Sequence, residues 1–137
     1  MPEIRNANIM ILATHGFEES ELLVPQRKLK EAGARVDVVS PEAGTIRGWK
    51  HKDWGETVQV DKTLDQVSAD DYDAIVLPGG QINPDLLRVN EQALKMIRAF
   101  LDSGKVVAAI CHAPWLLVEL DAVRGRNVTS YHSIKTD

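Results

Sequence analysis

The sequence predicts an α/β fold in which a doubly wound, mostly parallel sheet lies between layers of helices. Short apolar segments occur at 9–13, at 106–110 and, after a leading Asp73, at 73–77, and such segments are typical of strands that are buried on both faces of a sheet. Segments with apolar residues at helical spacing separate them, which is the alternation that predicts a parallel sheet. The length of 137 residues predicts a single domain over 1–137.

The first half of the chain is predicted to form a βαβ unit followed by an antiparallel excursion. The segment 9–13 predicts the first strand, and 18–32 predicts a helix with acidic residues in its first turn. Pro25 lies inside this helix and lacks an amide N–H, so a kink or a loosened first turn is expected there. The segment 35–40 alternates like a second strand, and the glycine-containing segment 44–62 predicts short antiparallel strands.

The second half repeats the alternation of strands and helices. The sequence predicts strands at 73–77 and 106–110, a loop at 81–85, helices at 90–103 and 115–120, and one more short strand at 127–130. Pro114 falls in the first turn of the last helix, a position that tolerates proline. Binding and catalytic sites of such sheets form at the carboxyl ends of the strands, so the residues that follow each strand are the candidates for a functional site.

Composition and charge exclude several classes of function. Sixteen Lys and Arg residues against twenty Asp and Glu residues give a net charge of -4, so nucleic acid is not an expected partner. The longest apolar run, 106–110, is far shorter than the roughly twenty residues that span a membrane. Because the first residues lack the pattern of a secretory signal, the expected compartment is the cytoplasm. The scattered histidines predict no metal site, and the pattern calls for no cofactor, since no dinucleotide fingerprint or Walker loop is present.

The single cysteine, Cys111, is either buried filler or a reactive thiol. It stands between a buried strand and a helix that begins at once, as the serine does in a nucleophile elbow. Unpaired amides at the start of a helix stabilise an anion and lower a thiol pKa from about 8.5. His112 follows directly and is a candidate base or proton donor. The local pattern alone leaves both interpretations of Cys111 open.

Two other predicted strand ends carry residues suited to chemistry. Gly79 and Gly80 follow the strand at 73–77, and glycines there either present backbone amides to a developing oxyanion or merely form a turn. Glu18 and Glu21 follow the first strand and lie three residues apart on one helix face. Most such acids are solvated, but this location brings one carboxyl within reach of a thiolate on a neighbouring strand end. The three tryptophans are interpreted as packing or interface groups.

These strand-end motifs, taken in order, resemble those of the ThiJ/PfpI superfamily and, within it, the PfpI-like intracellular protease/amidase branch. The matching segments are 17–21, 76–80, 108–114, 124–126 and 129–137, so the likeness covers essentially the whole chain. The resemblance implies a flavodoxin-like sandwich that is usually dimeric or higher. It also implies that Cys111 is the nucleophile, that His112 assists it, and that Glu21, rather than Glu18, contacts the sulfur. The amides of Gly80 and His112 would form the oxyanion hole, beside Gly79.

The resemblance also points to differences from the family pattern. PfpI-like members complete a triad with an acid from an adjoining subunit, and the best match is Asp85, where the pattern has a glutamate. Family members continue beyond the region that ends at Asp137 with a further strand and helix, so a C-terminal layer of the sandwich is expected to be missing. An uncovered sheet face exposes apolar surface, which predicts a homo-oligomer or poor solubility.

Three functions follow from these residues. The first is a cysteine-dependent peptidase or amidase of the PfpI type, in which a thiolate attacks a carbonyl of a peptide or small substrate. The alternative is a cofactor-free glyoxalase or protein deglycase that acts on methylglyoxal or glycated protein, which needs the same Cys, His and acid. A second alternative is a non-catalytic, redox-sensing stress protein in which Cys111 is oxidised. The remaining interpretation is an inactive fragment.

Overall fold

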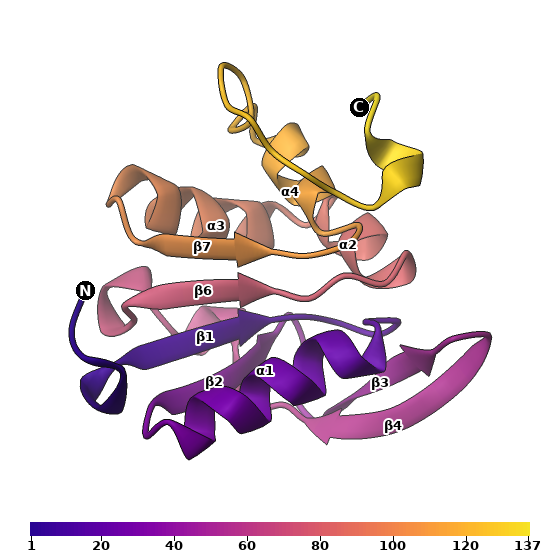
Figure 1. Ribbon diagram of the computed structural model, residues 1–137. Helices are drawn as coiled ribbons and strands as arrows, with labels where there is room; N and C mark the ends of the chain where they lie inside the picture. Colours follow the sequence, from indigo (N-terminus) through magenta and orange to yellow (C-terminus); the bar gives the residue numbers. More distant parts are fainter.

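A five-stranded parallel sheet forms the centre of the computed structural model, which describes residues 1–137 (Figure 1). The strand order is β5-β2-β1-β6-β7. The strands are β1 (Asn8–Leu12), β2 (Arg35–Ser40), β5 (Lys62–Thr63), β6 (Ala74–Leu77) and β7 (Val106–Ala109). All neighbouring pairs are parallel, so every carboxyl end lies at the same edge of the sheet. The predicted strands at 9–13, 35–40, 73–77 and 106–110 are therefore confirmed to within a residue or two.

Helices cover both faces of this sheet. Helix α1 (Glu19–Glu31) closes one apolar core, which contains Phe17 and Leu22, and α3 (Glu91–Asp102) closes the other, which contains Ile97 and Phe100. Each of these four side chains is fully buried, and burial of one such side chain is worth about 1.5–3 kcal/mol. The short helices α2 (Ile82–Leu87) and α4 (Pro114–Glu119) lie near the carboxyl ends of the strands. The predicted doubly wound α/β sandwich is confirmed.

The segment predicted to be an antiparallel excursion forms a two-stranded hairpin of β3 (Thr45–Lys50) and β4 (Asp53–Gln59). Backbone hydrogen bonds attach it to the loop between β1 and α1: the Gly16 N–H donates to the Arg47 carbonyl (2.8 Å), and the Trp49 N–H donates to the Phe17 carbonyl (2.6 Å). The hairpin thus holds the loop that leads into Glu18. Figure 1 shows it beside α1 at the carboxyl side of the sheet.

Two sequence predictions are wrong. Residues 81–85 do not form a loop, because helix α2 begins at Ile82. Pro84 lies in its first turn, where the missing N–H has no helical partner to lose. The segment 127–130 forms no strand, since no neighbouring strand offers it a ladder of hydrogen bonds.

At Pro25, where the sequence predicts a kink or a loosened first turn, helix α1 continues without a break.

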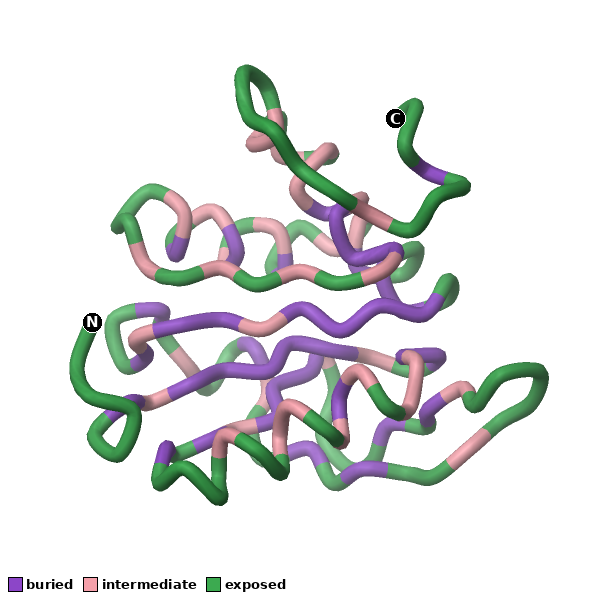
Figure 2. Tube along the Cα trace, viewed as in Figure 1, coloured by how far each residue is buried: buried purple, intermediate pink, exposed green.

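Strand β7 is the outer strand of the sheet on one side. Figure 2 shows β1 and β6 almost wholly buried, whereas β7 alternates between intermediate and exposed positions. Val106 and the following Ile110 are each 49% exposed. Val106 pairs with Ala74, which belongs to the core on the α1 face, so apolar side chains of β7 lie uncovered beside that core.

None of the helices combines the length and the apolar composition that crossing a membrane requires.

Candidate active site

Cys111 lies just past β7, in the turn between that strand and α4. Its φ is 63°, a left-handed backbone conformation that only two other non-glycine residues adopt in this chain. This conformation costs an ordinary L-residue about 1–2 kcal/mol. The turn is the sharp strand-to-helix elbow predicted from the sequence, and it leaves the thiol partly exposed.

Four groups surround the sulfur of Cys111. The Nδ1 atom of His112 lies 3.3 Å from Sγ, although side chains of adjacent residues often point apart. The carboxyl of Glu21 hydrogen-bonds with the thiol, and the backbone amides of Gly80 and His112 donate toward the sulfur. The structure therefore brings Cys111, His112, Glu21 and Gly80 together from three strand ends.

Glu21 and Glu18 occupy different positions. The Oε2 atom of Glu21 accepts a hydrogen bond from the Gly79 N–H (2.8 Å), which fixes its carboxyl beside the sulfur. Glu18 is the N-cap residue of α1, and its side chain makes no capping hydrogen bond. Of the two acids, Glu21 is therefore the one that contacts Cys111. Burial raises the pKa of Glu21, the Gly79 amide opposes this, and the nearby charge of Glu18 raises the pKa further.

The structure does not give the thiol the lowered pKa that the elbow pattern predicts. Burial raises the pKa of Cys111, and the negative charge of Glu21 raises it further, while the amides of Gly80 and His112 lower it. Helix α4 has only six residues, so its N-terminus contributes little against these effects. A thiolate beside a carboxylate is disfavoured by the repulsion of like charges, so Cys111 keeps its proton more readily than the elbow pattern predicts.

His112 is buried at 9% exposure and packed between aromatic rings. The ring of Tyr131 stacks on it with centroids 4.5 Å apart, and Trp115 meets it edge-on at 5.1 Å. Burial lowers the pKa of His112, and the charge of His132 lowers it further, so the neutral imidazole is favoured. A neutral imidazole beside a thiol can accept its proton.

The C-terminal segment contributes contacts that the sequence did not predict. The Tyr131 N–H donates to the Cys111 carbonyl (2.7 Å), which ties this segment to the elbow. Ser133 Oγ lies 3.5 Å from His112 Nε2, on the side of the ring away from the sulfur. Nothing in the local pattern around Tyr131 or Ser133 signals these contacts, because they depend on how the chain returns over α4.

The two positions after β6 must be glycine, because other segments of the chain approach their backbone closely. A Cβ atom on Gly79 would lie 2.5 Å from Glu21 Oε2 and 2.7 Å from the Cys111 Cβ. Gly80 has φ 78°, and a Cβ atom there would collide with the Gly16 carbonyl and lie 2.7 Å from the Glu18 amide. Both predicted site glycines therefore lie against the loops that carry the acid and the thiol.

Asp85 is not brought to Cys111 and His112 within one chain. It lies on the exposed side of α2, in the first turn of that helix. Its role as an acid supplied to a second copy stays a prediction. No group of three or more His, Cys, Asp or Glu side chains converges that could hold a metal ion.

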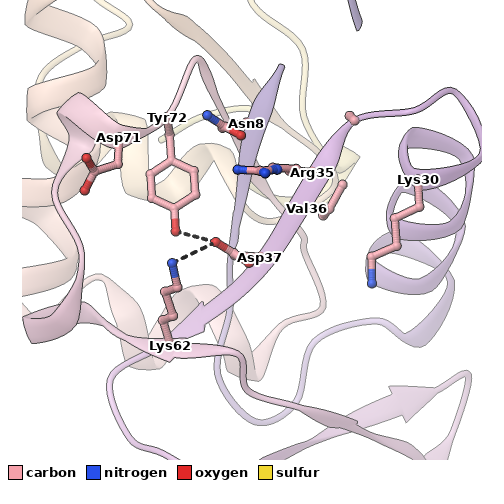
Figure 3. Close-up of a pocket in the computed structure, with 9 residues that line it drawn as sticks. Asn8, Lys30, Arg35, Val36, Asp37, Lys62, Asp71 and Tyr72 are labelled. Atoms are coloured by element: carbon pink, nitrogen blue, oxygen red, sulfur yellow. Dashed lines mark hydrogen bonds and ion pairs between the residues drawn. The ribbon is translucent and has the colours of Figure 1, made fainter. Parts of the chain in front are cut away.

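A hollow of about 570 Å³ lies at the opposite edge of the sheet, where the strands begin (Figure 3). Figure 3 shows that Tyr72 and Lys62 both point toward Asp37. The Tyr72 hydroxyl donates to Asp37 Oδ2 (2.7 Å), and Lys62 Nζ lies 3.5 Å from the same oxygen. The acid in this hollow is therefore already satisfied by a hydroxyl and a cation, and no thiol or histidine lines it.

Comparison with known proteins gives one consistent result. The model of the DJ-1/PfpI family matches residues 7–137. Deglycase PfpI of Pyrococcus furiosus is 43% identical over 129 residues, which are 94% of this chain and 75% of the relative. Bacillus subtilis YraA, named provisionally as a cysteine protease, is 40% identical over 94% of this chain and 74% of the relative.

A solved structure confirms the architecture as well. The crystal structure of a two-domain protein with DJ-1/ThiJ/PfpI-like and ferritin-like domains from Anabaena variabilis superposes with a TM-score of 0.89 at 32% identity. The match covers 96% of this chain and 37% of that one. The predicted resemblance and flavodoxin-like fold are thus confirmed, and the names of the relatives agree with a cysteine-dependent enzyme. The chain belongs to the DJ-1/PfpI family.

Proposed function

We propose that this protein is a cysteine-dependent deglycase that acts on early glycation adducts of 2-oxoaldehydes and on the free aldehydes. The observation that carries this proposal is the position of Cys111 on the elbow, with His112 Nδ1 at 3.3 Å and the Glu21 carboxyl hydrogen-bonded to the thiol. A base and an acid on the same thiol suit reversible addition to a carbonyl. The deglycase names of relatives such as the Pyrococcus furiosus protein support a glycated substrate.

In the proposed reaction the thiol proton moves to the neutral imidazole of His112 and the sulfur attacks the aldehyde carbon. A carbon–sulfur bond forms, and the carbonyl electron pair moves onto oxygen. The Gly80 and His112 amides, which already donate toward this region, stabilise the oxyanion. The His112 imidazolium then returns this proton to that oxygen, which gives a hemithioacetal.

From the hemithioacetal, His112 moves a proton between the two former carbonyl carbons, which gives a thioester of a 2-hydroxy acid. Water hydrolyses this thioester, releasing the acid and restoring the thiol. For the hemiaminal of a glycated amine, the carbon–sulfur bond replaces the carbon–nitrogen bond, His112 passes the thiol proton to the leaving amine, and the same hemithioacetal results. The sequence needs no redox partner, because one carbon is oxidised while its neighbour is reduced.

The test is incubation of the purified protein with methylglyoxal and with a model peptide carrying a freshly formed methylglyoxal adduct. Lactate formation and loss of the adduct are followed by NMR. The expected result is catalytic lactate release that Cys111→Ser lowers at least a thousandfold, since the hydroxyl of Ser is a far weaker nucleophile than a thiolate. A variant with wild-type turnover, or a wild-type protein with none, would reject the proposal.

A peptidase is the second candidate, because YraA is named provisionally as a cysteine protease and has a similar sequence. Amide hydrolysis needs a leaving group that is protonated by His112 after thiolate attack. Release of a fluorescent amine from peptide amides, abolished by Cys111→Ser, with no lactate from methylglyoxal, would favour this function. Loss of peroxide sensitivity alone in Cys111→Ser would favour the redox-sensing alternative.

The oligomeric state and the acid supplied in trans belong to the same proposal. Asp85 is exposed on α2, next to the exposed apolar side chains of Ile82 and Leu86. A second copy of the chain packed on this exposed surface of α2 would bring Asp85 toward the active site of its neighbour. Light scattering is expected to show a dimer or a larger assembly, and Asp85→Asn is expected to lower turnover without changing that assembly. A monomer with full turnover would reject both expectations.

A further inference from the structure

We propose that Asn83 is a positioning residue that orients the two peptide groups of the glycine loop toward Glu21 and Cys111. The inference rests on the proposed function only for its effect on turnover; its effect on the thiol does not need that function. The sequence pattern predicts a loop over 81–85 and gives Asn83 no role.

The side chain of Asn83 is completely buried, at 0% exposure. Its Oδ1 accepts from the Thr14 N–H (2.8 Å), just past β1. Its Nδ2 donates to the Pro78 carbonyl (2.9 Å) and to the Gly79 carbonyl (3.2 Å), just past β6. One amide side chain on α2 therefore joins the carboxyl ends of two neighbouring strands.

The geometry of the peptide bond carries these contacts to the site. In a trans peptide the carbonyl and the N–H point in opposite directions, and this chain has no cis peptide bond. The Pro78 carbonyl shares its peptide group with the Gly79 N–H, which donates to Glu21 Oε2 (2.8 Å). The Gly79 carbonyl shares its peptide group with the Gly80 N–H, which donates toward Cys111. By holding both carbonyls, Asn83 aims both N–H groups.

Such an orienting contact matters here because glycine peptides rotate easily. Two consecutive glycines lack the side chains that restrict φ and ψ, so the loop has no rigidity of its own. The Glu18 N–H also donates to the Gly79 carbonyl, but that contact is longer, at 3.4 Å. An amide is the suitable group, because it accepts from Thr14 and donates to the two carbonyls at once, which neither a carboxylate nor a hydrocarbon does.

The test compares Asn83→Ala and Asn83→Asp with the wild type. Asn83→Asp keeps the acceptor for Thr14 and loses the two donors. Asn90→Ala is the matched control, because Asn90 caps α3 through the Ala93 N–H (2.9 Å) and has no hydrogen bond to the glycine loop. The readout is the rate at which iodoacetamide alkylates Cys111, the only thiol, as a function of pH.

Both Asn83 variants are expected to shift the midpoint of the alkylation profile to higher pH, because an N–H donor that stabilises the thiolate is no longer aimed at it. A shift of one pH unit corresponds to about tenfold slower alkylation at neutral pH. Turnover of methylglyoxal is expected to lose kcat with little change in KM. Asn90→Ala should keep the wild-type profile even though it loses a cap bond. A folded Asn83→Ala with the wild-type profile would overturn the inference.

Two further outcomes separate this inference from the proposed function. A shifted profile in a protein that converts no methylglyoxal overturns the function and supports the positioning role. Should neither Asn83 variant fold, amide hydrogen exchange of the wild type decides. Slow exchange of the Asn83 side-chain NH₂ and of the Gly79 and Gly80 amides supports the role, and exchange as fast as that of an exposed asparagine overturns it.

Discussion

Each of the two edges of the sheet holds a partly buried acid, but the groups that surround the acid differ between the two edges. Where the strands begin, Asp37 is held by the Tyr72 hydroxyl and lies 3.5 Å from Lys62, so its charge has a hydrogen-bond donor and a cation. Where they end, Glu21 has the Gly79 amide and a thiol, and no cation lies within ion-pair distance of it. The first arrangement gives the carboxylate a hydrogen-bond donor and a neighbouring cation. The second sets the carboxyl against a thiol, and burial raises the pKa of both groups.

The backbone differs between the two edges as well. The hollow at the amino ends is lined by ordinary strand and helix residues and contains no glycine. The carboxyl ends place two glycines and a strained cysteine against one another. The carboxyl ends of the strands, the reactive edge, are therefore assembled by close backbone approach at a cost in backbone strain, whereas the amino ends are held by side-chain pairing.

The largest effect is expected for Gly80→Ala, which tests the close approach at the reactive edge. The new methyl group would meet the Gly16 carbonyl and the Glu18 amide, both backbone groups, in addition to the strain of a φ of 78°. The expected loss in the free energy of unfolding is about 3 kcal/mol or more. Gly104→Ala is the control, since Gly104 has a similar φ of 70° and open space around it, and about 1–2 kcal/mol is expected. Equal losses in chemical denaturation would contradict the close-approach argument.

Glu21→Gln tests whether the partly buried charge of Glu21 lowers the stability of the folded protein. Because burial raises the pKa of Glu21 in the folded protein, its ionised form is disfavoured there at neutral pH. The neutral variant is expected to unfold a few degrees above the wild type at pH 7, while losing turnover. The difference in stability between the variant and the wild type should disappear near pH 4, because the Glu21 carboxyl of the wild type is then protonated in both the folded and the unfolded protein. A variant less stable than the wild type at pH 7 would show that the Gly79 hydrogen bond outweighs burial.

Tyr72→Phe is the corresponding change at the other edge, and the smallest of the three effects is expected. Asp37 is partly exposed and Lys62 lies near it, so loss of this hydrogen bond should cost only about 0.5–1 kcal/mol, with no change in the alkylation profile of Cys111. Burial and the hydrogen bond to Asp37 raise the pKa of Tyr72 in the folded protein. Wild-type stability should therefore fall above about pH 10, where the unfolded tyrosine ionises, and the variant should be spared part of this fall. An altered thiol profile would show that the two edges are coupled.

The sequence predicted the parts of this molecule that depend on local patterns. Buried strands have a characteristic apolar composition, so the positions of β1, β6 and β7 follow directly. Gly80 and Cys111 lie just past β6 and β7, and Glu21 lies in the first turn of the helix that follows β1. The resemblance, which the family match confirms, implies Glu21 rather than Glu18. The Gly79 N–H holds the carboxyl of Glu21, and the role of Glu21 in the reaction stays a prediction.

The remaining parts depend on contacts between distant segments. Helix α2 was missed because Asn83 and Pro84 are usual in turns, whereas here the buried amide of Asn83 is satisfied by three backbone groups from two strand ends. The packing of Tyr131 on His112 depends on the path of the C-terminal segment. The raised thiol pKa was missed because the elbow pattern shows the helix amides and does not show the charge of Glu21.

The left-handed backbone of Cys111 has an evolutionary consequence. Glycine and asparagine adopt a φ near 63° more readily than cysteine does, so either substitution relieves strain at the elbow while removing the sulfur. Selection for folding stability alone would therefore favour replacement of the cysteine at this position. In descendants that have lost their substrate, position 111 should drift to glycine or asparagine sooner than the surrounding core changes, and retention of cysteine there would mark lineages in which the chemistry is still under selection.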